Sequence, residues 1–184
     1  MKLNYTLPQI ADCVRVHVLR DNGGYWLDVD TIMLSNKLPK TNMIGNSEKR
    51  ENTIGYLYTK PHSQMFEEWA AYQDEVIKRH SKNTSWDLFG NAFTDKYVKE
   101  HKDITISSVQ SSWPETYMIF GNQPRFKKYT QFYFYDNYKL KDLEPTNMLM
   151  LHNSWTPEWY KRLSYHEIIN TKCTLSNILR EVTS

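Results

Sequence analysis

Residues 22–30, Asn22-Gly23-Gly24-Tyr25-Trp26-Leu27-Asp28-Val29-Asp30, decide how this 184-residue chain begins its fold. The glycine pair predicts the end of a helix, because glycine accepts the left-handed backbone found just past a helix C-terminus. The residues after it predict a short strand entered directly from the turn. Because side chains alternate along a strand, we expect Trp26, Asp28 and Asp30 on one face. The two apolar residues between them are expected to face a core.

The helix expected before this strand has a recognisable start. Thr6 and Gln9 have the spacing of a capping box, in which the two residues satisfy each other's free groups. Ile10, Val14 and Val18 follow at i, i+4 and i+8 and form one apolar stripe. The sequence therefore predicts a helix that begins near Thr6 and ends at the glycine pair.

The rest of the chain indicates a mixture of helices and strands. Helices are expected over residues 62–80, over 91–100 and in the tail, where Ser164 and Glu167 have capping-box spacing. Strands are expected as short pieces over 31–60, over 103–110 and 130–135, and in the apolar run 147–151. The pattern predicts one α/β domain over residues 1–184.

Composition excludes several classes of protein. Hydrophobic residues make up 40% and charged residues 24%, which fits a soluble globular protein rather than a disordered one. No apolar run approaches the roughly 20 residues that span a bilayer. The net charge of +2 gives no electrostatic footprint for nucleic acid. Two cysteines make no disulfide framework, so a reducing cytoplasm is the expected location.

Asp28 and Asp30 are the first candidates for chemistry. Two carboxylates at a strand end can hold a hard divalent cation such as Mn²⁺ or Mg²⁺. An isolated Asp-x-Asp is a weak signal, and a solvated turn is its plain alternative. Asp12 and Arg15, at i and i+3 on the preceding helix, either reach the same ligand or form an exposed ion pair.

Taken together, these residues carry a resemblance to a known family. Ala11-Asp12-Cys13-Val14-Arg15, followed by residues 23–30, resembles the sugar-nucleotide site of GT-A glycosyltransferases. The similar groups are glycosyltransferase family 32, the capsular polysaccharide synthesis proteins, and the catalytic core of glucosylating clostridial toxins. Their pattern is S/A-D-x-x-R, a helix, and then G-G-x-Y/W-x-D-x-D. The implied fold is a GT-A-like, Rossmann-like mixed sheet flanked by helices.

The resemblance implies a role for each matching residue. Asp12 and Arg15 would contact the hydroxyls of the donor sugar, with Arg15 near the diphosphate. Trp26 would line the donor site. Asp28 would touch the ribose, a metal-bound water or the metal itself, and Asp30 would ligate Mn²⁺ or Mg²⁺. In such enzymes the metal replaces the glycine-rich phosphate loop, which this chain lacks.

A second match lies at His152-Asn153-Ser154-Trp155. The resemblance implies that His152 is a third metal ligand and that Ser154 and Trp155 bind phosphate oxygens of the donor. The plain alternatives are a strand-end histidine bonded to backbone and a core tryptophan. Residues 86–90 resemble the mid-chain loop near the acceptor, where Asp87 is a further candidate contact.

The implied function is a metal-dependent glycosyltransferase of the hexosyltransferase type, expected to be retaining. Its donor would be a nucleotide sugar, a UDP-sugar above all, and its acceptor a glycan or lipid-linked glycan in capsular or cell-surface polysaccharide synthesis. The enzyme would be cytoplasmic, or peripheral at the inner face of the membrane.

The start of the chain departs from the family. Only eight residues precede the first helix, so the strand–helix units that bind the base are expected to be absent. A split gene, a complementing N-terminal chain or a shortened relative would each account for this. One alternative is therefore a catalytically inert or complementing fragment that binds carbohydrate or a partner chain. Another is an interaction domain whose Asp-x-Asp is accidental.

Overall fold

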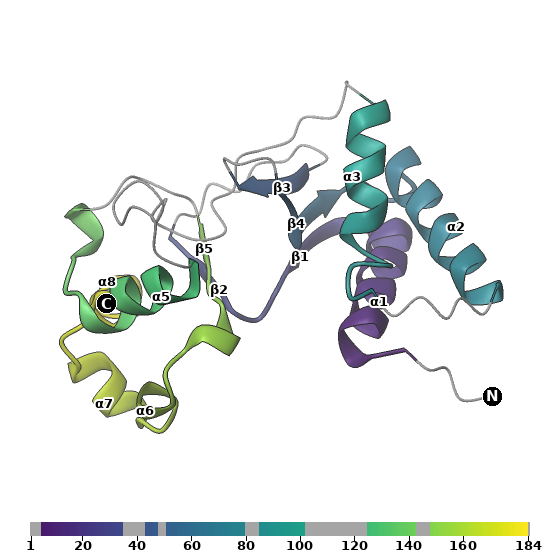
Figure 1. Ribbon diagram of the computed structural model, residues 1–184. Coiled ribbons are helices and arrows are strands. Elements are labelled where there is room, and N and C mark those ends of the chain that lie inside the picture. The colour runs from purple at the N-terminus through teal and green to yellow at the C-terminus, as the bar shows by residue number, and fades with distance from the viewer. Residues whose placement is uncertain are drawn as a thin grey trace. The chain divides into compact units, whose positions relative to one another are not determined.

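The computed structural model describes residues 5–34, 43–47, 51–79, 85–101, 125–142 and 148–183. The chain divides into two units, each with its own small antiparallel sheet. Unit 1 contains Met1–Asp28 and Pro39–Val109, and unit 2 contains Val29–Leu38 and Gln110–Ser184. Both units hold helices and strands, which confirms the prediction of a mixed α/β protein (Figure 1).

Helix α1 (Leu7–Asn22) begins and ends where the sequence predicts. At its start, the side-chain oxygen of Gln9 accepts a hydrogen bond from the Thr6 backbone N–H at 2.9 Å. At its end, Gly23 has φ of +64° and donates its N–H to a carbonyl of the last turn. A side chain at this position would be strained by the left-handed backbone and would overlap the Pro61 ring. The turn therefore requires glycine.

The apolar stripe on α1 faces outward. Ile10, Val14 and Val18 are 42%, 48% and 45% exposed. Such a stripe ordinarily faces a core, but here the buried side is partly polar. That side consists of Gln9, Asp12, Arg15, Val16 and Leu19. The helix therefore turns Asp12 and Arg15 inward, and the contacts that make this possible form the candidate site.

The sheet of unit 1 has three strands in the order β1-β4-β3. They are β1 (Gly24–Leu27), β4 (Glu51–Thr59) and β3 (Met43–Ser47), and both pairings are antiparallel. Strand β4 is central and pairs with β1 along the whole length of β1. The strand that follows the glycine pair is thereby fixed at the edge of this sheet.

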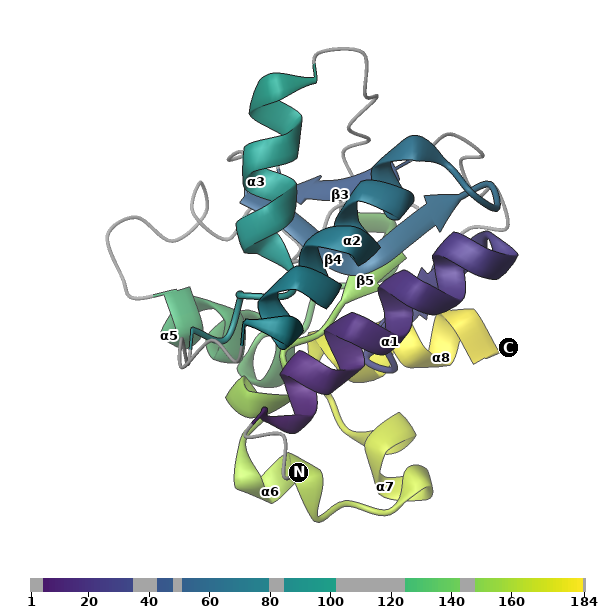
Figure 2. The ribbon, with the colours of Figure 1, turned by 90° about the vertical axis from the view of Figure 1, so that its right-hand side faces the viewer.

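Helices α1, α2 (Gln64–Lys78) and α3 (Asn91–Glu100) lie on the same side of this sheet (Figures 1 and 2). Both α2 and α3 match predicted helices. The core beneath them contains Val16, Leu19, Ile54, Leu57, Met65, Phe66, Trp69, Ala70 and Tyr97. Trp69 is fully buried, and its indole N–H donates to the Phe89 carbonyl at 2.9 Å. Apolar packing between α1, α2 and the sheet therefore holds the buried side of α1 in place.

Strand β1 is shorter than the sequence predicts. Asp28 still donates its N–H to the Gly55 carbonyl at 2.8 Å, but Val29 and Asp30 form a turn. Val29 is fully exposed and does not face a core. The prediction that Asp30 shares a strand face with Trp26 and Asp28 is wrong, because sheet pairing stops before it. Asp28 is the last residue of this part of unit 1, and Asp30 belongs to unit 2.

Unit 2 is built mainly from helices around a two-stranded sheet. Strand β2 (Thr31–Met33) pairs antiparallel with β5 (Met148–Met150). The helical elements are α5 (Arg125–Thr130), η1 (Gln131–Tyr135), η2 (Leu140–Asp142), η3 (Asn153–Trp155), α6 (Glu158–Lys161), α7 (Tyr165–Asn170) and α8 (Thr174–Thr183). The capping box predicted for Ser164 and Glu167 opens α7, where the Ser164 N–H donates to Glu167 Oε2 at 2.8 Å.

Residues 130–135 form helical structure, so the predicted strand is wrong. They continue α5 into the π-helical turn η1, and the Asp136 N–H closes that turn on the Gln131 carbonyl at 2.9 Å. Phe132, Tyr133 and Phe134 are all buried, whereas a strand would have buried alternate residues. The overlooked signal is the i, i+3, i+4 spacing of Tyr129, Phe132 and Tyr133, which is helical.

Two further expectations from the sequence concern a strand over residues 103–110 and membrane-spanning segments. The strand predicted over residues 103–110 lies outside the described residues. In the described part, no helix combines the length and the apolar composition that crossing a bilayer demands.

Candidate functional site

Arg15 is the centre of a charged cluster in unit 1. Its Nη2 atom lies 3.2 Å from Asp12 Oδ1, one turn earlier on α1, and 3.3 Å from Asp28 Oδ1, just past β1. Its Nη1 atom donates to the backbone carbonyl of Ile54 on β4. The side chains of Arg15 and Asp12 are each 8% exposed, whereas that of Asp28 is 33% exposed. The structure therefore brings three predicted site residues together, with one carboxylate near the surface.

Trp26 completes this cluster. Its indole N–H donates to Asp28 Oδ1 at 2.9 Å, which confirms that these two side chains share a face. The guanidinium carbon of Arg15 lies 5.2 Å from the centre of the Trp26 ring, within the range of a cation–π contact. Asp28 Oδ1 thus receives two donors, one from each side chain. The cluster defined by Asp12, Arg15, Trp26 and Asp28 is called the Arg15 cluster below.

The electrostatics of the Arg15 cluster are incompletely balanced. Two carboxylates share one guanidinium. Burial raises the pKa of Asp12 to about 6; Arg15 partly offsets this shift, and the negative charge of Asp28 adds to it. The Nε atom of Arg15 is also buried and has no hydrogen-bond partner among the described residues. A buried donor without a protein partner, beside a perturbed carboxyl, makes this cluster a candidate site for a bound ligand or water.

The turn over residues 86–90 forms a wall beside Asp12. A Cβ atom at Gly90 would overlap the end of the Ile54 side chain and lie 3.1 Å from Asp12 Oδ2, so a larger residue there would require these side chains to shift. The Nε2 atom of Gln73 holds the turn by donating to the Phe89 carbonyl at 2.7 Å. The sequence analysis missed Gln73. The signal that could have identified it is an uncharged polar residue on the otherwise apolar side of α2.

Asp87 has a local role in the same turn. Its carboxylate accepts a hydrogen bond from the Ser85 hydroxyl, two residues before it. The neighbouring Trp86 is 69% exposed. Asp87 therefore shapes the turn, and a contact with the acceptor stays a prediction.

Unit 2 brings Asp30 and His152 to one end of its sheet. The Leu151 N–H donates to the Asp30 carbonyl at 2.8 Å, directly beyond the Thr31–Met150 pair of the β2–β5 ladder. His152 is the next residue after Leu151. Two residues predicted as metal ligands are thereby placed at the same sheet end by backbone pairing.

Tyr129 on α5 supports this sheet end and was missed by the sequence analysis. Its hydroxyl accepts the His152 N–H at 2.9 Å, and its side chain is 1% exposed. Burial raises the pKa of Tyr129 to about 12; the hydrogen bond from His152 acts against this shift, and the carboxylate of Asp30 adds to it. The hydroxyl therefore keeps its proton at neutral pH.

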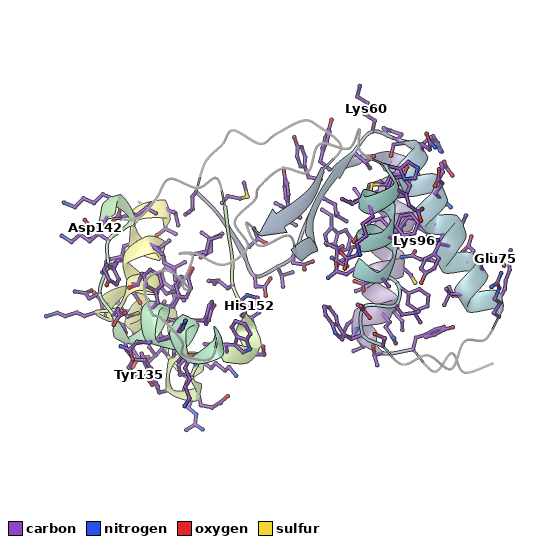
Figure 3. The ribbon with its side chains drawn as sticks, turned by 45° about the horizontal axis from the view of Figure 1, so that its top comes forward. Lys60, Glu75, Lys96, Tyr135, Asp142 and His152 are labelled. Atoms are coloured by element: carbon purple, nitrogen blue, oxygen red, sulfur yellow. The ribbon has the colours of Figure 1, made fainter. Side chains whose placement is uncertain are left out.

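Two rings pack against His152, whose position in unit 2 is labelled in Figure 3. The centre of the His152 ring lies 4.2 Å from the centre of the Trp155 ring. The centre of the Tyr129 ring lies 5.4 Å from that of His152 and 5.3 Å from that of Trp155. The Thr130 hydroxyl also donates to the Trp155 carbonyl at 3.1 Å. Ser154, which lies between His152 and Trp155 in the sequence, is exposed. Tyr129, His152 and Trp155 form what is called the aromatic cluster below.

The chemistry of the predicted ligands suits a hard divalent cation, because carboxylate oxygens and an imidazole nitrogen bind Mn²⁺ well. Asp30 and His152 lie in unit 2, and Asp28 lies in unit 1. Among the described residues, no group of three His, Cys, Asp or Glu side chains is gathered closely enough to hold a metal ion. Within unit 2, the sheet end supplies two such groups.

Comparison of the sequence with family models and with curated proteins found no match.

Proposed function

We propose that this chain is a metal-dependent glycosyltransferase of the hexosyltransferase type, with a GT-A-like site. It would transfer a sugar from a nucleotide-sugar donor, a UDP-sugar above all, to a glycan or lipid-linked acceptor in capsular or cell-surface polysaccharide synthesis. The observation that carries this proposal is the Arg15 cluster. The guanidinium of Arg15 contacts the carboxylates of both Asp12, on the same helix, and Asp28, at the end of the following strand. Trp26 on that strand donates its indole N–H to Asp28.

The Arg15 cluster has the groups that a sugar diphosphate requires. The carboxylate of Asp12 can accept hydrogen bonds from sugar hydroxyls. The planar guanidinium of Arg15 matches phosphate oxygens, and its unpaired Nε leaves one donor for them. Trp26 adds a flat apolar surface with its N–H already engaged by Asp28. Together these side chains support recognition of a donor with both hydroxyl and phosphate groups.

Mn²⁺ or Mg²⁺ is the cofactor that the proposal requires. Asp30 and His152 would hold it in unit 2, and Asp28 is the third ligand that the family resemblance implies. A bound cation would neutralise the charge that develops on the departing nucleoside diphosphate. Ser154 is exposed beside His152, where its hydroxyl could donate to a phosphate oxygen. Trp155 packs against His152 and would keep that loop in position.

Thermal unfolding in the presence of Mn²⁺ and UDP tests the proposal. A ligand at 100 times its Kd stabilises a protein by about 2.7 kcal/mol, which is a measurable rise in Tm. The rise should disappear in Asp30→Ala and persist in Asp142→Ala, which removes an exposed carboxylate elsewhere in unit 2. An unchanged rise in Asp30→Ala would overturn the metal assignment.

A second candidate function is an inert or complementing fragment that binds carbohydrate or a partner chain. One observation favours it: Asp28 is already neutralised by Arg15, as in an ion cluster that only stabilises a fold. Hydrolysis of a UDP-sugar separates the two candidates. The enzyme should release UDP slowly in the presence of Mn²⁺, whereas an inert fragment should release none.

A further inference from the structure

Two exposed aromatic rings lie in contact on unit 2. Tyr135 in η1, labelled in Figure 3, is 57% exposed, and Trp159 in α6 is 38% exposed. Their ring centres are 6.0 Å apart with the planes at 61°, and the Trp159 indole N–H donates to the Tyr135 hydroxyl at 3.1 Å. Single exposed aromatics are normal on a protein surface, but two in defined contact form a patch. Neither residue belongs to the Arg15 cluster or to the aromatic cluster.

Buried rings hold this exposed pair in place. The Trp159 ring contacts that of Tyr160 at 5.4 Å between centres, and Tyr160 in turn contacts Phe134 at 4.9 Å. Tyr160 and Phe134 are only 5% and 2% exposed. Phe134 directly precedes Tyr135 in the chain, so both exposed rings are anchored to the same buried neighbours. A ligand that stacks on them therefore has little side-chain ordering to oppose it.

The π-helical turn η1 places polar side chains beside the rings. Gln131 and Tyr135 are exposed and Asp136 is partly exposed, whereas the three residues between Gln131 and Tyr135 are buried. The Gln131 Nε2 atom donates to Asp136 Oδ1 at 2.8 Å. Among the described residues, no hydrogen bond engages Gln131 Oε1 or Asp136 Oδ2. Single π-helical turns are frequent at functional sites, and this one gathers a ring, an amide and a carboxylate on its outward side.

We propose that Tyr135 and Trp159 form a contact surface for an uncharged glycan chain, which stacks on the two rings and forms hydrogen bonds with Gln131 and Asp136. This surface rests on the proposed function in one respect only: the glycan is taken to be the acceptor of the transferred sugar. Every residue of the surface lies in unit 2.

The chemistry of these groups matches a sugar. The apolar C–H face of a pyranose covers a flat aromatic ring and removes it from water. Because the two rings meet at an angle, one can stack on a sugar while the other borders its edge. The Tyr135 hydroxyl accepts the indole N–H and keeps its own proton to donate. The free oxygens of Gln131 and Asp136 accept from sugar hydroxyls, and the Asp136 carboxylate repels an acidic sugar.

Titration of the full chain with cellohexaose and maltohexaose, two neutral glucose chains, tests the surface without metal or nucleotide. Binding is followed by NMR through the indole N–H signal of Trp159, which Trp159→Phe identifies. Trp159→Ala and Tyr135→Ala should each weaken glucan binding about tenfold or more, since each removes a stacking ring. Tyr135→Phe keeps its ring and should weaken binding about two- to tenfold, the value of one hydrogen bond.

The matched control is Tyr165→Ala, which removes a ring that is 67% exposed on α7 in the same unit. It should leave glucan binding unchanged. Asp136→Asn should keep glucan binding and allow hexagalacturonate, an acidic chain, to bind more tightly than it does to the wild type. Binding that survives in both Trp159→Ala and Tyr135→Ala, or that falls equally in Tyr165→Ala, would overturn the inference.

Failure of this surface and failure of the proposed function give different results. A Tm that rises with Mn²⁺ and UDP, in a chain that binds neither glucan, would overturn the surface and leave the transferase. Glucan binding through Trp159, with no effect of Mn²⁺ and UDP on Tm, would support the surface and remove the transferase. A dimer in analytical ultracentrifugation that Trp159→Ala dissociates, without glucan binding, would make the patch an interface between two copies and overturn the inference.

Discussion

The Arg15 cluster of unit 1 and the aromatic cluster of unit 2 hold their candidate site residues by opposite means. In unit 1, buried charges face one another with one guanidinium for two carboxylates. In unit 2, His152 and Trp155 rest on the buried ring and hydroxyl of Tyr129. The first arrangement responds to any change of charge, whereas the second positions its residues whether or not a ligand is present.

This difference shows where each kind of residue contributes. Burying carboxylates without full compensation costs folding free energy, and a ligand can relieve that cost. Aromatic packing stabilises the folded state and keeps side chains in defined positions. We therefore expect substitutions in the aromatic cluster to lower stability, and removal of the buried Asp12 carboxylate from the Arg15 cluster to raise it.

Tyr129→Ala should give the largest effect. Truncating a buried aromatic residue costs about 3–5 kcal/mol of unfolding free energy, because transfer and cavity terms add. Tyr129→Phe keeps the ring and loses only the hydrogen bond from His152, which is worth about 1 kcal/mol. Urea unfolding of the two variants measures both values. Equal losses in the two variants would show that the hydroxyl, rather than the ring, supports this sheet end.

Asp12→Asn should raise the unfolding free energy near neutral pH by about 2–3 kcal/mol. This is the free energy that corresponds to the shift of the Asp12 pKa from 3.8 to about 6. Between these values the folded state binds more protons than the unfolded state, so wild-type stability falls as pH rises from about 4 to 6. Asparagine does not ionise, and the gain should therefore vanish near pH 4. Urea unfolding at pH 4, 5.5 and 7 measures the difference.

The control for this prediction is Asp21→Asn on the same helix. Arg20 lowers the pKa of the exposed Asp21, so its carboxylate is favourable in the folded state and its loss should bring no gain at pH 7. A loss of stability in Asp12→Asn at pH 7 would contradict the prediction. It would mean that the ion pair with Arg15 outweighs the desolvation of Asp12.

Gly90→Ala should cost about 1–3 kcal/mol, the range for overpacking a filled site. The added Cβ would overlap the Ile54 side chain and press on Asp12 Oδ2 at 3.1 Å. The φ of Gly90 is −115°, so no positive-φ strain adds to the effect of the lost space. Gly24→Ala is the matched comparison, because its Cβ would meet open space but its φ is +92°. A neutral Gly90→Ala would show that the turn can withdraw from Asp12.

Local signals in the sequence predicted several elements of both units correctly. Capping boxes and a glycine with positive φ fix helix ends through contacts a few residues apart, so α1 and α7 could be placed. The motif spacing also brought Asp12, Arg15 and Asp28 together, since a helix and the strand after its turn leave little freedom. Contacts from distant segments could not be predicted. Tyr129 meets His152 across 23 residues, and Gln73 meets the Phe89 turn from another helix.

Hydrophobic periodicity misled the sequence analysis in residues 130–135, and helix α1 also departs from what such patterns ordinarily indicate. In residues 130–135 the alternation of Phe and Tyr indicated a strand, but all of Phe132, Tyr133 and Phe134 are buried in a helix. Tyrosine counts as half-polar in such a pattern, although its ring packs like that of phenylalanine. On α1 the stripe of Ile10, Val14 and Val18 is partly exposed, and the ion cluster of Asp12 and Arg15 is buried. Charges that neutralise one another can therefore reverse the orientation that hydrophobicity predicts.

Val14 and Val16 test that reversal with the smallest expected effect. Val16 is fully buried in the core of unit 1, and Val14 is 48% exposed on the stripe. Val16→Ala should cost about 2 kcal/mol through lost burial and a cavity, whereas Val14→Ala should stay within about 0.5 kcal/mol of the wild type. Urea unfolding measures both variants under the same conditions. Equal costs would mean that another surface covers the stripe in solution, and the contrast between a charged inner side and an apolar outer side of α1 would no longer hold.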